Sequence, residues 1–478
     1  MKNSRVLGLM ALALMLVAPP LKAMDFKWSG TYRIEGYQFF NPELDKGVNK
    51  TYGLHHLTLR PQIVAGDGLL IQARFDLLNS DNYPNSQLGQ FFGSGPGVVA
   101  NATHSHDSNA LTQVQSSESL EVTHLYLTYI QEHGALIVGR APLHFGLGMT
   151  YHAGEGPFDH WLTTRDLLGY RVVMGNFYLL PMIAKINEGD ITQGDDVNEI
   201  MFHAQYEDVE AEMELGFFFQ RRRGSPLASD APAGFGASAI LGGSGAQASD
   251  SFEVERFNFY AQRRFDVHNL AVEIGMEKGR SGVRTGLGQA VEFTGFGLAA
   301  EYEFKPQGSA WAWGLKAGMA SGDNPTTDEK FEGYLFHRNY NVAMMLFNHP
   351  LGHTDILRTD LQAPGATGAK PRGSSVDTET ISNVAYLAPQ VSYAWRENWS
   401  IDGAAVFGWL STIPVEAVAD MGRNLGMEID LGLNFSPRPG VQWVNQVGLL
   451  FPGAAFEVGG TQSAHFAWGL ASKASISF

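Results

Sequence analysis

Apolar and polar residues alternate one by one along most of the chain after residue 24. Near its start, Phe26, Trp28 and Ile34 stand at alternate positions, and polar residues such as Ser29 and Glu35 stand between or beside them. A period of two places successive side chains on opposite faces of a strand, so the pattern predicts β-strands with one apolar and one wet face. About 18 segments have the length of about 9–11 residues that a tilted membrane strand needs. They begin near residues 26, 54, 69, 119, 135, 169, 177, 198, 210, 252, 270, 291, 309, 380, 399, 425, 441 and 464.

The connections between these segments alternate between short and long. The short ones fall at residues 66–68, 131–134, 175–176, 207–209, 266–269, 305–308, 396–398 and 436–440. The long ones include residues 79–118, 142–168, 223–251 and 321–379. An outer-membrane barrel has short periplasmic turns and long outward loops, whereas a soluble sandwich has no reason to gather its long loops at one end. The expected fold class is all-β: a single transmembrane antiparallel β-barrel of about 18 strands, with 16 as the alternative count.

The first residues are typical of a secretory signal peptide. Lys2 and Arg5 precede an apolar run at residues 6–18, and cleavage is expected after Ala23. A signal anchor is the alternative, but the run is shorter than the roughly 20 residues that span a bilayer. We therefore expect a signal peptide at residues 1–23 and an exported barrel at residues 24–478.

Composition excludes several classes of protein. The chain has no cysteine and a net charge of −16, so a disulfide-stapled domain, a cysteine-ligated metal protein and a basic nucleic-acid binder are excluded. Only 17% of its residues are charged, and its 55 glycines are many for an ordinary soluble enzyme. This composition suits β structure and one large architecture without a dividing linker.

The C-terminal segment resembles a known assembly signal. Ile476 and Phe478 end an alternating run, as in the C-terminal signature of bacterial outer-membrane barrels, although Lys473 stands where those proteins commonly have glycine. With the other features, the chain resembles Gram-negative porins, and its strand count resembles the alginate-export and substrate-selective types. The resemblance implies an outer membrane of lipid and lipopolysaccharide, recognition by the barrel-assembly machinery through Ile476 and Phe478, and passage of small hydrophilic solutes. It leaves monomer and homotrimer open.

Charged residues on the wet faces are expected to line the channel, because a barrel of 16–18 strands encloses water. The basic candidates are Lys27, Arg33, Arg60, Arg74, Arg140 and Arg171. The acidic candidates are Glu210, Glu212, Glu214, Glu273, Glu277, Asp402, Glu428 and Asp430. A basic arc opposite an acidic arc would create a transverse field that sets ion preference. The alternative is that these charges pair locally and only keep the lumen wet.

The third long connection, residues 142–168, is unusually apolar for a loop. Its apolar side chains need burial, and its charges need water or counter-charges. By resemblance to porins it would fold into the barrel and narrow it; a lid on the outer rim is the alternative. The candidate constriction residues are Glu155, Asp159, Arg165 and Asp166.

The expected function is passive diffusion of small hydrophilic solutes or ions, without a chemical step, cofactor or metal. No His-Glu-x-x-His pair and no Gly-x-Ser-x-Gly elbow occurs in the sequence, so no catalytic residue is proposed. Two alternatives use the same fold: a barrel enzyme of lipase or protease type, and an adhesin or structural barrel. The fold alone does not decide among them.

Overall fold

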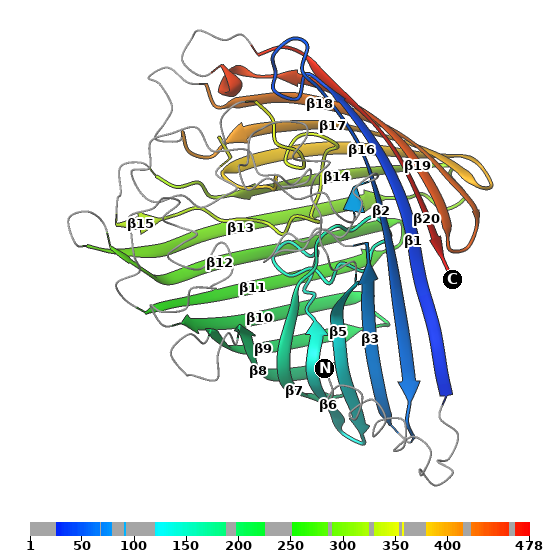
Figure 1. Ribbon diagram of the computed structural model, residues 1–478, viewed down its shortest axis with the longest axis vertical. Coiled ribbons are helices and arrows are strands. Elements are labelled where there is room, and N and C mark those ends of the chain that lie inside the picture. Colours follow the sequence, from blue (N-terminus) through cyan, green and yellow to red (C-terminus); the bar gives the residue numbers. More distant parts are fainter. Residues whose placement is uncertain are drawn as a thin grey trace, which may run out of the picture.

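One closed antiparallel barrel of 18 long strands makes up the molecule, and the predicted count is confirmed. The barrel closes because β1 (Asp25–Phe40) pairs with both β2 (Asn49–Val64) and the last strand, β20 (Ala467–Ser477). Figure 1 shows the strands following one another around the wall. The computed structural model describes residues 25–66, 68–78, 90–91, 120–187, 197–224, 251–284, 289–324, 329–352, 356–357, 379–413, 422–457 and 464–478. The predicted signal peptide, residues 1–23, lies outside these ranges.

The remaining long strands follow in chain order and pair with their neighbours. They are β3 (Leu69–Leu77), β5 (Leu120–Gln131), β6 (Gly134–Pro142), β7 (Thr164–Met174), β8 (Phe177–Asn187), β9 (Val197–Asp208), β10 (Met213–Gly224), β11 (Phe252–Phe265), β12 (His268–Arg284), β13 (Ala290–Phe304), β14 (Trp311–Ala320), β16 (Val384–Arg396), β17 (Trp399–Leu410), β18 (Asn424–Arg438) and β19 (Val441–Pro452). Three short elements are also present: β4 (Gln90–Phe91), β15 (Lys330–Phe331) and the 3-10 helix η1 (Ala454–Phe456). Within the described ranges, no helix is long and apolar enough to cross a membrane.

The two faces of the wall differ as the alternation predicts. In β1, Phe26, Trp28 and Ile34 are exposed on the outer surface, whereas Arg33 and Glu35 are buried inside the barrel. The outer surface of a barrel in a bilayer contacts lipid, so exposed apolar side chains there are expected. Other outward-facing apolar residues, on strands where they alternate with buried inner residues, are Leu59, Phe75, Leu127, Phe217 and Met427.

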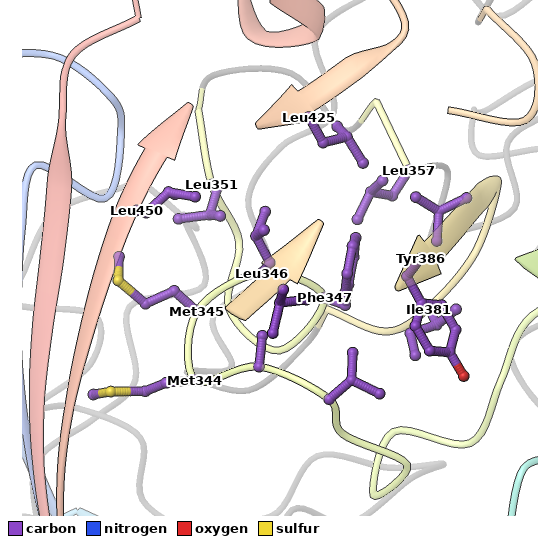
Figure 2. Packing of buried hydrophobic residues seen from close by; sticks show 14 of the residues in the cluster. Met344, Met345, Leu346, Phe347, Leu351, Leu357, Ile381, Tyr386, Leu425 and Leu450 are labelled. Atoms are coloured by element: carbon purple, nitrogen blue, oxygen red, sulfur yellow. The ribbon is translucent and has the colours of Figure 1, made fainter. Parts of the chain in front are cut away.

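Two connections fold into the barrel and form its apolar core. The first inward segment is residues 143–163, between β6 and β7; the second is residues 329–352, between β14 and β16. Figure 2 shows Met345, Leu346 and Phe347 of the second segment packed among wall residues such as Leu425 and Leu450. The hydrophobic core therefore lies within the lumen, where each inward segment is buried against the wall.

Candidate functional site: the lumen and its inward segments

The first inward segment crosses the lumen, and its apolar residues pack on the inner wall. The Phe145 ring lies 5.7 Å from the Phe218 ring of β10, and the Tyr151 hydroxyl donates a hydrogen bond of 2.7 Å to Gln220 Oε1. Phe218 and Gln220 are both buried on the lumen side of β10. The segment therefore occupies the inward position expected for a constriction, and the described residues do not form a lid on the rim.

Arginines of the wall hold the backbone of this segment. Arg74 of β3 donates to the Gly154 carbonyl oxygen at 2.7 Å, and Arg33 of β1 donates to the Asp159 carbonyl oxygen. Both arginines are almost fully buried. Both are predicted to line the lumen, and in the structure they lie on its inner wall and anchor the first inward segment.

Carboxylates of the wall hold the same segment from other sides. Glu273 of β12 accepts hydrogen bonds from the backbone N–H groups of Leu147 (2.8 Å) and Met149 (3.1 Å). Glu35 of β1 contacts His160 Nε2 at 2.8 Å. A buried carboxylate is costly unless donors surround it, so these contacts make the position of the segment specific.

The second inward segment is held in the same way by residues of β18. Glu428 of β18 accepts from the backbone N–H of Met345 and of Leu346, each at 2.7 Å, and Asp430 accepts from Met344 N at 3.0 Å. Glu428 is completely buried. These two acidic candidates therefore bind backbone donors of a loop and do not form an open acidic arc.

Most other charges of the inner wall pair with a neighbour. The pairs are Arg33 with Glu35 (3.0 Å), Arg74 with Asp76 (3.0 Å), Arg165 with Glu199 (2.6 Å), Arg222 with Glu199 (2.6 Å) and Arg256 with Glu277 (2.5 Å). Local neutralisation leaves little separation of charge across the lumen at these positions. The geometry corresponds to the local-pairing alternative rather than to opposing basic and acidic arcs.

Two candidates lie on the outer surface, which corrects their assignment to the lumen. Arg140 of β6 and Asp166 of β7 form an exposed ion pair at 2.7 Å, on the same face as the exposed Val138 and Leu168. The residues before Arg140 are apolar at four successive positions, 135–138. Because apolar and polar residues do not alternate in this run, the sequence does not show whether Arg140 faces the lumen or the lipid.

Two further candidates lie in a periplasmic turn and not on the wall. The sequence pattern predicts Glu210 and Glu212 on a strand that begins near residue 210. In the structure β10 begins at Met213. Asp208 accepts a hydrogen bond from Ala211 N at 2.9 Å and stabilises a turn over residues 209–212. The alternating glutamates imitate a strand pattern that this turn interrupts.

The remaining candidates lie on the lumen side of the wall. Lys27 is at its exposed periplasmic end, 3.6 Å from Asp25, and the Arg171 guanidinium lies 5.7 Å from the Tyr178 ring. Glu214 accepts from Gln205 Nε2 at 2.6 Å, and Asp402 accepts from Asn434 Nδ2. Arg60 interacts electrostatically with Glu155 and Asp159 of the first inward segment and with Arg74.

The two inward segments meet in the lumen. His337 N donates to the Met149 carbonyl oxygen at 2.6 Å, and Thr150 Oγ1 lies 2.7 Å from the Tyr334 hydroxyl. Asn339 Oδ1 accepts from Trp161 N at 3.0 Å. We call this contact the seam; it joins the two inward segments inside the barrel.

Three histidines lie in a row beside the seam. The ring centroids of His144 and His152 are 5.1 Å apart, and those of His152 and His337 are 5.4 Å apart. Burial lowers the pKa of His144 and His152 below the ordinary value, and burial together with neighbouring cationic groups lowers the pKa of His337 well below it. Neutral imidazoles therefore suit this position.

A polar cavity of about 630 Å³ lies between the second inward segment and the wall. Most of its polar lining is amide and charged: Gln262, Asn269, Glu301, Glu303, Lys316, Gln390, Asp402, Asp430, Asn434, Gln446 and Lys473. Lys316 pairs with Glu301 at 3.0 Å, whereas Glu303 and Asp402 have no ion-pair partner among the residues that the structure describes. Across those residues, no group of three or more histidine and acidic side chains could hold a metal ion. The lumen thus contains a space lined by amide and charged side chains.

Sequence reasoning missed the second inward segment. Both inward segments carry the same sequence signal, which is a run of apolar residues within a long connection. In the second segment these residues include Tyr334, Phe336, Tyr340 and Phe347. Apolar groups in a loop require burial, and the lumen was the available place. The same argument applied to residues 321–379 would have found it.

The fold and the lumen define a class: a closed 18-strand barrel of outer-membrane porin architecture, narrowed from within by two inward segments. Two solved structures share this fold. Acinetobacter baumannii OccAB3 matches with a TM-score of 0.52 and 9% identity, covering 95% of this chain and 99% of the other. Pseudomonas aeruginosa OccK8 (OprE) matches with a TM-score of 0.50 and 11% identity, covering 95% and 98%. No family model matches the chain, and no curated protein sequence does.

Proposed function

We propose that this protein is an outer-membrane channel through which small hydrophilic solutes diffuse passively. The observation that carries the proposal is the polar cavity of about 630 Å³ inside a closed barrel with an apolar outer wall. A membrane span that encloses water and polar side chains provides a path for solutes which lipid excludes. The path requires no chemical step.

The inward segments set the size and the chemistry of this path in our proposal. The wall residues that anchor them, among them Arg74, Glu273 and Glu428, are buried and hydrogen-bonded. Such anchored segments are rigid enough to act as a filter. Solutes that pass them are small, and they carry hydroxyl, amide or charged groups that can exchange hydrogen bonds with the amides of the cavity.

Recordings in a planar bilayer test the proposal. The folded protein should give discrete conductance steps, and liposomes that contain it should swell in small sugars faster than in larger ones. Heat-unfolded protein is the control for leakage. A folded protein that gives neither steps nor swelling would contradict the channel function and favour the structural barrel; hydrolysis of added lipid or peptide would favour the enzyme.

A further inference from the structure

Three adjacent strands carry a cluster of charges on their outer faces. In β10, Arg221 and Arg223 alternate with the buried Gln220 and Arg222, so they point away from the lumen. The same alternation in β11 and β12 turns four further charged residues outward. We call the set the basic strip: Arg221, Arg223, Glu253, Glu255, Lys278 and Arg280.

Four cations of the basic strip share two carboxylates. Glu253 pairs with Arg221, with Arg223 at 3.0 Å and with Arg280 at 3.6 Å, and Glu255 pairs with Lys278 at 3.4 Å. The carboxylates lie deeper: their side chains are 21% and 26% exposed, against 56% for Arg223 and 62% each for Lys278 and Arg280. The surface of the strip is therefore cationic.

The strip lies between an apolar band of the outer wall and a long connection, where lipid headgroups are expected. Directly below it on the same face, the Phe219 and Phe257 rings and the Phe217 and Phe259 rings pack in pairs, each 5.1 Å apart, and present an apolar surface to lipid. Above it, β10 ends and β11 begins at the long connection 225–251. Figure 1 shows β10, β11 and β12 side by side with these ends together. The strip thus occupies the outer boundary of the apolar band.

Charged residues on the strands beside the basic strip do not cancel its positive charge. Glu292 of β13 stands next to Arg280 in register, and Lys330 stands next to Glu292. On the other side, Arg140 pairs with Asp166, and Lys185 stands opposite Asp166. Among the described residues, cations outnumber carboxylates on this arc even when Glu329 beside Lys330 is included, although the whole chain carries −16.

The outward face of the barrel differs where β1 and β20 meet, at the ends that carry Phe40 and Trp468. There it is aromatic: the rings of Phe40 and Trp468 stack with their centroids 4.0 Å apart. The basic strip is therefore not repeated at this junction, and we expect the ligand on the side of β10, β11 and β12.

We propose that the basic strip binds the phosphate groups of an anionic lipid in the outer leaflet. Guanidinium forks pair with phosphate in a bidentate manner, and basic residues at a membrane surface attract anionic headgroups. The acyl chains of the lipid would lie on the aromatic pairs below the strip. This binding is independent of conduction through the lumen.

Lipid binding to the folded barrel in detergent tests the proposal by native mass spectrometry. The probe is bisphosphorylated lipid A, with dephosphorylated lipid A and phosphatidylethanolamine as comparison lipids. We expect the parent to retain the bisphosphorylated lipid and the double variant Arg223→Gln with Arg280→Gln to bind it at least tenfold more weakly. Arg263→Gln, exposed on the outer face of β11 at its periplasmic end, is the matched control and should bind as the parent does.

The lysine variant Arg223→Lys with Arg280→Lys keeps the charge and should recover part of the binding, which separates loss of the site from loss of folding. Equal binding of phosphorylated and dephosphorylated lipid would overturn the proposal, as would parental affinity in the glutamine variant. A glutamine variant that binds lipid normally but loses a protein oligomer would show instead that the strip contacts a second copy of the chain.

Discussion

At the scale of single residues, the position of a side chain on the inner or outer face decides what it does. Arg74 and Arg140 have the same chemistry, yet Arg74 is buried and holds a loop carbonyl, whereas Arg140 lies exposed on the outer wall. The difference arises from the register of two strands. A substitution therefore tests the face on which a residue lies as much as its chemistry.

Phe217 provides a test of the outer face. Its ring packs 5.1 Å from Phe259 on the lipid side of β10, and an arginine there would be placed in hydrocarbon. We expect Phe217→Arg to reduce the free energy of unfolding by about 2–4 kcal/mol, and Met213→Arg, at the periplasmic end of the same face, to cost no more than about 1 kcal/mol. Urea titration followed by tryptophan fluorescence in lipid vesicles measures both; equal costs would mean that Phe217 does not face lipid.

Charges without a partner in the cavity should set the ion preference. Glu303 and Asp402 line the cavity without an ion-pair partner among the described residues, whereas Glu301 is neutralised by Lys316. A unit charge a few ångströms from a passing ion is worth about 1 kcal/mol in water-like surroundings. We expect the double variant Glu303→Gln with Asp402→Asn to lose cation preference severalfold.

The reversal potential across a gradient of potassium chloride measures this preference. The matched control is the double variant Glu301→Gln with Lys316→Gln, which removes an ion pair and leaves the net charge of the cavity unchanged. The single variant Glu301→Gln is not suitable as a control, because it leaves Lys316 without its partner and should itself move the reversal potential toward anion preference. An unchanged potential in the Glu303 and Asp402 variant would show that ions do not pass this cavity.

At the scale of elements, the two inward segments and their seam are expected to set the width of the proposed channel. Each segment is attached to the wall by charged residues, and the two are attached to each other by backbone and side-chain hydrogen bonds. The ladder of the 18 long strands is formed by hydrogen bonds between neighbouring long strands, and the two-residue β15 is the part of the second segment that pairs with it. The segments are therefore expected to be removable without loss of the barrel.

Deletion of residues 154–159 should widen the channel. It removes the part of the first inward segment that Arg74 and Arg33 hold across the lumen. We expect larger single-channel conductance and faster liposome swelling in larger sugars, with the barrel still folded because loops contribute little to the strand ladder. Deletion of six residues within the connection 225–250 controls for the shortening of a loop as such. Parental swelling rates in the first deletion would reject the constriction.

Acid should loosen the seam. Burial lowers the pKa of His337 well below its ordinary value, with His152, His144 and Arg338 as the cationic neighbours that lower it further. A histidine whose pKa is lowered by folding binds a proton more readily when the seam is open than when it is closed. The stability of the closed seam is therefore complete above about pH 6.5, and it falls as the pH decreases from there toward the lowered pKa. We expect conductance to rise or fluctuate more at pH 5 than at pH 7.

The double variant His152→Asn with His337→Gln removes two of the three imidazoles and should weaken this response. Asp159, 3.7 Å from His152 Nδ1, opposes part of the effect because it favours the protonated ring. Bilayer recordings at the two pH values decide the matter. The same response to acid in parent and variant would place the sensitive group elsewhere.

At the scale of the whole molecule, pairing of the first strand with the last closes the sheet into a barrel. The last residue takes part in that closure: Phe478 N donates to Gly30 O at 3.0 Å, and Gly30 N donates to Phe478 O at 2.9 Å. A closed barrel has no free strand edge, so all backbone groups in the bilayer are paired. The aromatic ring of Phe478 is exposed on the outer surface beside this joint.

The C-terminal residues should therefore matter for assembly more than for conduction. We propose that Ile476 and Phe478 are read by the barrel-assembly machinery, as their resemblance to the known signature implies. Phe478→Ala is expected to reduce the amount of folded barrel in the outer membrane severalfold, and the barrels that do form should conduct normally. Heat-modifiable mobility in gels measures the folded amount, and Ser477→Ala is the control. A normal amount of folded Phe478→Ala protein would contradict the role.

The sequence alone determined the strands, their number and the face of the wall on which most residues lie. Each of these depends on local rules: a period of two in a strand, and short turns that alternate with long loops. The rules failed where the local pattern is silent, as in the wholly apolar run before Arg140, or misleading, as in Glu210 and Glu212. The strand predicted to begin near residue 210 begins at Met213 in the structure, because the Asp208 side chain stabilises a turn before it.

Only the tertiary structure decided what the charges of the lumen do. Glu273 and Glu428 accept backbone hydrogen bonds from segments more than 80 residues away along the chain, at 2.8 Å and 2.7 Å. A pattern of residues shows that a carboxylate faces inward, but the free energy of burying it depends on which distant donors reach it once the barrel has closed. The same closure brings together the seam and turns the basic strip outward. The barrel wall follows from the sequence, because strand periodicity is local; the shape of the lumen is set by contacts that exist only across it.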